Sequence, residues 1–84
     1  MIRYRVRSSV AVENDLALIW LQASDRDAVT RASNEIDQVL ETAPLTRGIA
    51  LDGAYSLTVA PLTVIYQVSP QKRLVTIEKF IYQG

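Results

Sequence analysis

The chain contains no cysteine and no histidine among its 84 residues. Without cysteine, neither disulfide bonds nor thiolate metal sites can stabilise a domain of this size. Without histidine, the commonest general base, metal ligand and switch near neutral pH is missing. These two absences exclude zinc chemistry and Ser-His triads, and we expect no metal and no cofactor.

The chain also lacks a long apolar run and an excess of charge of either sign. Residues 16–21 form the longest apolar stretch near the N-terminus. This stretch is far shorter than the ~20 residues of a membrane span, and no signal-peptide core precedes it. We therefore expect a soluble cytoplasmic protein without a membrane partner. Nine basic residues balance nine acidic ones, so direct sequence-specific DNA binding is not expected.

The length predicts one domain over residues 1–84. A domain this small buries only ~60% of the surface that its unfolded chain exposes. Its stability is therefore marginal, and a protein that binds only the folded state would stabilise it.

A regular alternation of apolar and polar residues runs through positions 57–68, on both sides of Ala60-Pro61. A period of two places one row of side chains on a buried face and the other row outside. The segment therefore predicts a β-hairpin, in which Ile65 is an apolar residue on the outward side. The inward row is Leu57, Val59, Leu62, Val64, Tyr66 and Val68.

Other patterns predict a first strand, two helices, a loop and three further strands. Residues 2–6 alternate as a strand with three arginines on one face, and Ser8-Ser9 offers a cap for a helix over 10–22. A capping box at 24–27 begins a second helix, which Pro44 ends. Residues 44–54 are predicted to be a loop. Strands are expected at 55–60, 62–69 and 73–82, with a turn at 69–72.

These elements predict an α+β fold: an N-terminal strand, an antiparallel helical hairpin, and then a three-stranded antiparallel sheet. The hairpin is expected to cover one face of the sheet, with Trp20 as an anchor in the core. Trp20→Ala would then cost about 3–5 kcal/mol.

The order of elements and three short motifs resemble the RelE/ParE superfamily of toxins from type II toxin–antitoxin modules. The motifs are Leu57-x-Val-x-x-x-x-Val-Ile-Tyr-x-Val68, Asp15-Leu16 with Ile19-Trp20, and Pro44 followed by Gly48. The resemblance implies a toxin neutralised by a cognate antitoxin whose extended C-terminal segment wraps around it. It also implies either mRNA cleavage on the ribosome, as in RelE, or inhibition of DNA gyrase, as in ParE.

The sequence departs from the active-site pattern of RelE-like ribonucleases. Thr63 stands where the resemblance places a strand arginine, no histidine can substitute, and the chain stops at Gly84 without the family's basic tail. Arg73, Lys79 and Tyr82 are the remaining candidates for catalysis, although they can equally be solvated or edge residues of a strand. The departures argue against a ribonuclease and slightly favour gyrase inhibition. A degenerate member that retains only partner binding is a further alternative.

A partner-binding surface is predicted from charge and from one misplaced apolar side chain. Arg3, Arg5 and Arg7 can form bidentate pairs with phosphates or with an acidic antitoxin segment. They can equally be the charged face of an edge strand, where charge deters unwanted pairing. Arg47 is a candidate phosphate contact beside Gly48. Ile65 is expected to anchor a partner, unless the loop at 44–54 covers it.

Overall fold

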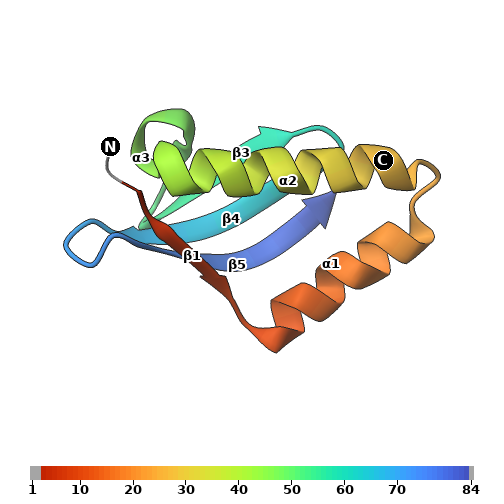
Figure 1. The fold of residues 1–84 in the computed structure, drawn as a ribbon, viewed down its shortest axis with the longest axis horizontal. Coiled ribbons are helices and arrows are strands. Elements are labelled where there is room, and N and C mark those ends of the chain that lie inside the picture. Colours follow the sequence, from red (N-terminus) through yellow and green to blue (C-terminus); the bar gives the residue numbers. More distant parts are fainter. Residues whose placement is uncertain (1–2, 84) are drawn as a thin grey trace.

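The computed structural model describes residues 3–83, which fold into two layers (Figure 1). Ile2, which the sequence predicts in the first strand, lies outside the described residues. In chain order the elements are β1 (Arg5–Ser8), α1 (Val10–Gln22), α2 (Arg26–Thr42), α3 (Pro44–Arg47), β2 (Ile49–Leu51), β3 (Ala54–Val59), β4 (Leu62–Ser69) and β5 (Leu74–Tyr82).

The described strands form one sheet in the order β1-β5-β4-β3-β2. Strand β1 pairs in parallel with β5, and the other neighbours are antiparallel. Helices α1 and α2 lie on the same face of this sheet, with α2 across its middle and α1 beside β5 (Figure 1). The predicted α+β architecture is confirmed, and its other sheet face is left open by both long helices.

The core lies between α2 and the central strands. Leu62, Val64 and Tyr66 of β4 are fully buried, as are Ile36 and Leu40 of α2. The inward row of the hairpin therefore follows the period of two that the sequence predicted.

Both long helices begin at side-chain caps. The Ser9 hydroxyl oxygen accepts a hydrogen bond from the backbone N–H of Val12 at 3.2 Å, which confirms the first predicted helix. The second helix is capped one residue later than predicted, because the Asp25 carboxylate, rather than Ser24, accepts the N–H of Ala28 at 3.0 Å. Asx and Ser side chains are both favourable caps, and the pattern alone does not choose between adjacent ones.

The prediction of a loop over residues 44–54 is wrong, because this segment contains α3 and β2. Pro44 occupies the first turn of α3, where its missing N–H costs nothing. The three residues of β2 pair with β3 through Ile49 opposite Ser56 and Leu51 opposite Ala54. The sheet therefore gains an edge strand beyond the three that were expected after the helices.

The first strand and the last turn also shift along the sequence. Strand β1 covers Arg5–Ser8, and the N–H of Arg5 donates to the carbonyl oxygen of Arg73 at 2.8 Å. Among the described residues it therefore begins later and ends later than the predicted strand. The β4–β5 turn is closed by the N–H of Arg73 and the carbonyl oxygen of Pro70, one residue later than predicted. Arg73 takes a left-handed backbone conformation there, with φ 50°.

Trp20 is not the core anchor that the sequence predicted, since 39% of its surface is exposed. The inward side of α1 is formed by Val12, Leu16 and Ile19. One further residue advances the helix by about 100°, which turns Trp20 away from the sheet. Its indole N–H donates to the Thr30 hydroxyl at 3.1 Å instead.

Candidate partner-binding face

The open face of the sheet carries an apolar patch, made up of Ile49, Leu51, Ile65 and Ile81. Ile49 and Ile65 both flank Ser56 on the neighbouring strands. Ile49 is 69% exposed and Ile81 is 37% exposed, while Ile65 is half-buried. Residues 49–51, part of the predicted loop, continue the sheet as β2 beside β3. Isolated exposed apolar residues are ordinary, but several on one face of a sheet are typical of an interaction site.

Two of the predicted arginines border this face. The register of β1 with β5 sets Arg5 opposite Leu74 and Arg7 opposite Thr76, on the side of the sheet away from the helices. Lys79 shares that side, opposite Ile65. All three cations are exposed. The structure therefore groups Arg5 and Arg7 with Ile65 on one surface, which we call the open face.

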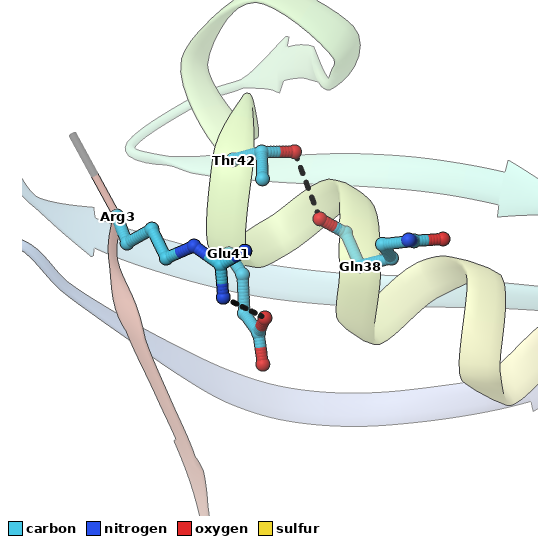
Figure 2. Close-up of polar contacts among 4 residues, drawn as sticks. All are labelled: Arg3, Gln38, Glu41 and Thr42. Carbon is cyan, nitrogen blue, oxygen red and sulfur yellow. Dashed lines mark hydrogen bonds and ion pairs between the residues drawn. The ribbon is translucent and has the colours of Figure 1, made fainter. Parts of the chain in front are cut away.

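Arg3 and Arg47 lie elsewhere, next to α2. The Arg3 guanidinium reaches the carboxylate of Glu41 at 3.8 Å, and both side chains are largely exposed (Figure 2). Arg47 is the last residue of the short helix α3 and lines a shallow depression with Glu35 and Thr42. A backbone hydrogen bond explains the position of Arg3. The N–H of Tyr4 donates to the carbonyl oxygen of Glu41, which holds this segment against the end of α2 before the pairing of β1 with β5 begins.

The three candidate catalytic residues are not brought together. Arg73 precedes β5 and Tyr82 ends it, so about 9 residues at ~3.3 Å each separate the two along the strand. Tyr82 pairs with Leu62 and packs against the core side of the sheet, whereas Lys79 faces the open side. No two of these three residues are therefore placed to act on the same phosphate group.

The side chain of Thr63 is buried, although it lies on the side of β4 that faces away from the helices. It is 7% exposed, and its hydroxyl shares a 2.8 Å hydrogen bond with the Thr58 hydroxyl. Its cross-strand neighbours in the described sheet, Thr58 and Ile81, are uncharged. The position that the resemblance assigns to an arginine therefore supplies no positive charge.

The charges are divided between the two layers. Residues 10–42, which form α1 and α2, carry seven of the nine acidic residues and only two of the nine basic ones. The remainder of the chain carries seven basic and two acidic residues. The helical layer is therefore net negative and the sheet layer net positive, although the whole chain is neutral.

Sequence reasoning missed part of the open face. Ile49 and Leu51 belong to it, and their alternation around Ala50 was visible in the sequence. The prediction of a loop over residues 44–54 does not account for this alternation. Ile81 was visible too, as the outward neighbour of Phe80 and Tyr82 in the last strand.

Comparisons with known proteins find relatives by structure only. No family model matches the sequence, and no curated protein matches it either. A chain of the toxin–antitoxin complex RelBE2 from Mycobacterium tuberculosis superposes with a TM-score of 0.79 at 19% identity, over 98% of this chain and 93% of that one. A chain of the RelE–RelB complex from Pyrococcus horikoshii gives 0.72 at 22% identity, over 100% and 98%. The isolated Escherichia coli RelE toxin gives 0.56 at 16% identity, over 96% and 85%.

The protein therefore has the fold of RelE-type toxins. The likeness extends over essentially the whole chain and reproduces the order of strand, two helices and antiparallel strands that the sequence predicted. Among residues 3–83, no helix is both long enough and apolar enough to cross a bilayer.

Proposed function

We propose that this chain is the toxin component of a type II toxin–antitoxin module and that a cognate antitoxin neutralises it by covering the open face. The observation that carries the proposal is the apolar patch around Ile65, bordered by Arg5 and Arg7, on a domain with the RelE fold. Solved relatives of the same fold occur in complexes with antitoxins, which supports the same kind of partner here.

The open face provides both parts of a binding surface. Burying an isoleucine side chain contributes about 1.5–3 kcal/mol, so the apolar patch can hold a partner with slow dissociation. Exposed arginines act over a longer range and mainly raise the association rate, in a salt-dependent way. An antitoxin segment with apolar residues and carboxylates fits this combination.

The toxic activity is proposed to be binding to a target, with DNA gyrase favoured over messenger RNA on the ribosome. Attack by a ribose 2′-hydroxyl needs a base, an acid and a cation close to one phosphate. Arg73, Lys79 and Tyr82 lie apart on β5, and Thr63 contributes no charge. These positions support a protein that inhibits by binding.

Controlled expression in a bacterial host tests both levels of this proposal. Induction of the protein alone is expected to arrest growth, and co-expression of a short neighbouring reading frame is expected to restore it. Primer extension on translated messages should then show no new cuts, while gyrase-linked DNA breaks accumulate. Clear cuts at ribosomal A sites would contradict the proposed activity. Growth unaffected by induction, together with no binding to the neighbouring product, would contradict the toxin assignment.

A further inference from the structure

Helix α1 exposes far more apolar surface than a helix on the outside of a domain normally does. Val10 is 71% exposed, and Leu18 and Leu21 are each 54% exposed. The only buried residue of α1 is Val12. The helix packs against β5 and α2 and lies at the rim of the molecule (Figure 1). Because a surface helix normally keeps its outward side polar, this helix has the surface of a contact.

The exposed apolar residues fall on one side of α1. At about 100° per residue, Val10, Leu18 and Leu21 lie within about 80° of one another around the helix axis. The inward residues of α1 lie on the opposite side, about 180° away. Asn14 and Gln22 share the outward side and are also exposed. We call these five residues the outer face of α1.

The charge and the length of α1 oppose a membrane or a nucleic acid as the occupant of its outer face. Helices that lie on a membrane surface carry lysine and arginine on their polar side. Helix α1 carries Glu13 and Asp15 and no basic residue, so phosphate groups repel it. Its 13 residues are too few for a membrane span of ~20. A protein surface is therefore the occupant that fits.

The outer face is complementary to itself when two copies of α1 run antiparallel. Asn14 and Gln22 each lie four residues from Leu18, in opposite directions. In an antiparallel pair centred on Leu18, the two leucines meet, and Asn14 of each copy lies opposite Gln22 of the other. The two amide groups can then donate to and accept from each other, and a polar pair of this kind fixes the register of a helix seam. Such a contact uses the same patch on both copies and closes at a dimer.

Charge favours the antiparallel pair over a parallel one. Both acidic residues of α1 lie in its first half, and Arg26 follows its last turn, where the guanidinium donates to the carbonyl oxygen of Leu21 at 3.0 Å. A parallel pair would set the two Asp15 carboxylates side by side, where like charges repel. An antiparallel pair centred on Leu18 separates them by about six residues, or ~9 Å along the axis. It also turns the acidic half of each helix toward the end of the other that carries Arg26, and it opposes the two helix dipoles.

We propose that the outer face of α1 is a dimer interface, which pairs with the same face of a second copy of this chain around a two-fold axis near Leu18. A contact between two helices of 13 residues is smaller than the ~1,200 Å² of stable complexes, so the dimer is a transient one. We expect a Kd on the order of 100 µM. Because α1 lies on the helix side of the sheet (Figure 1), each copy keeps its open face uncovered. The dimer is therefore independent of the proposed antitoxin contact.

Sedimentation equilibrium of the full chain, over about 5–500 µM, tests the dimer. The average mass is expected to rise from 9.4 kDa toward twice that value. Leu18→Asp should stay monomeric at every concentration, because the two new carboxylates would meet. An equimolar mixture of Leu18→Asp and Leu18→Lys should dimerise again, since opposite charges then meet. Ile49→Asp is the matched control: Ile49 is 69% exposed on the open face, so this variant should dimerise as the unmodified chain does.

Single cysteines determine the orientation, because the chain has no cysteine of its own. On mild oxidation Leu18→Cys should form a covalent dimer, and a mixture of Asn14→Cys and Gln22→Cys should cross-link one variant to the other. Val10→Cys is the control, since an antiparallel pair sets the two Val10 positions about 16 residues, or ~24 Å, apart along the axis, beyond the reach of a disulfide bond.

Four results would each overturn the proposal. They are a monomer mass at every concentration, undiminished dimerisation of Leu18→Asp, dissociation of the dimer by Ile49→Asp, and cross-linking of Val10→Cys as fast as that of Leu18→Cys. Growth arrest and its rescue by the antitoxin would stand in all four cases, because the open face lies on the other side of the sheet.

Discussion

Gly48 lies against the hydroxyl group of Tyr66, where α3 leads into β2. Tyr66 is fully buried, and its hydroxyl donates a hydrogen bond to the carbonyl oxygen of Pro44 at 2.6 Å. A Cβ atom at position 48 would overlap that hydroxyl oxygen and lie 3.0 Å from Cζ of the same ring. The backbone of Gly48 is extended, with φ −83°, so any residue can adopt it. Overlap with the Tyr66 side chain, together with a tight approach of 3.1 Å to the Pro44 carbonyl oxygen, therefore opposes a larger residue at this position.

This contact predicts that two destabilising substitutions partly cancel. Gly48→Ala alone should cost about 1–3 kcal/mol through overpacking. Tyr66→Phe alone should cost about 1–3 kcal/mol, because the buried Pro44 carbonyl loses its partner. In the double variant, the added methyl group enters the space that the hydroxyl group leaves. The double variant should therefore be more stable than the sum of the single effects predicts, by at least about 1 kcal/mol.

Urea unfolding followed by far-ultraviolet circular dichroism measures this coupling, provided that the m-value is unchanged. Gly53→Ala is the matched control. Gly53 has φ +91°, and an added Cβ would meet open space, so alanine is strained there without touching Tyr66. Its cost should add to that of Tyr66→Phe within about 0.5 kcal/mol. Additive effects of Gly48→Ala and Tyr66→Phe would refute the proposed close approach.

Three further predictions follow from exposure and charge. Trp20→Ala should destabilise the domain less than Leu40→Ala does, because removing the fully buried Leu40 side chain costs about 2–5 kcal/mol. Chemical denaturation of both variants measures the two costs, and a larger cost for Trp20→Ala would show that Trp20 belongs to the core. Partial burial, and then the Glu41 carboxylate, raise the pKa of Asp37 above its usual 3.8, so its ionised form opposes folding as the pH rises past that value. Asp37→Asn should therefore raise the melting temperature at pH 7, and this gain should vanish below about pH 3.8; a gain that is independent of pH would contradict the cause given. Arg5→Ala should slow antitoxin association chiefly at low salt, and stopped-flow mixing measures this rate. An unchanged association rate would show that Arg5 is not part of the antitoxin-binding surface.

The parts of the fold that local patterns determine were predictable. The β3–β4 hairpin follows from the alternation around Ala60-Pro61, and α1 follows from its cap at Ser9. Strand β2 was missed because a three-residue strand exists only through its pairing with β3. The register of that pairing depends on tertiary context, which local strand propensity does not specify.

The candidate site was predictable only where strand periodicity applied. Ile65, Arg5 and Arg7 were placed on outward faces by the period of two, and the register of the sheet brings them to one side. Arg3 precedes the strand pairing and turns to Glu41, so the period does not reach it.

Binding of the antitoxin to two matched variants tests the central claim most directly. Ile65→Asp places a charge in the open face, whereas Leu18→Asp makes a similar change at an exposed position of α1, on the other side of the sheet. Titration calorimetry on variants that unfold cooperatively should show Kd raised at least about tenfold by Ile65→Asp, since 1.4 kcal/mol is lost with even part of one buried isoleucine. Leu18→Asp should change Kd by less than about twofold. Equal affinities of Ile65→Asp and the unmodified protein would contradict the claim that the open face binds the antitoxin.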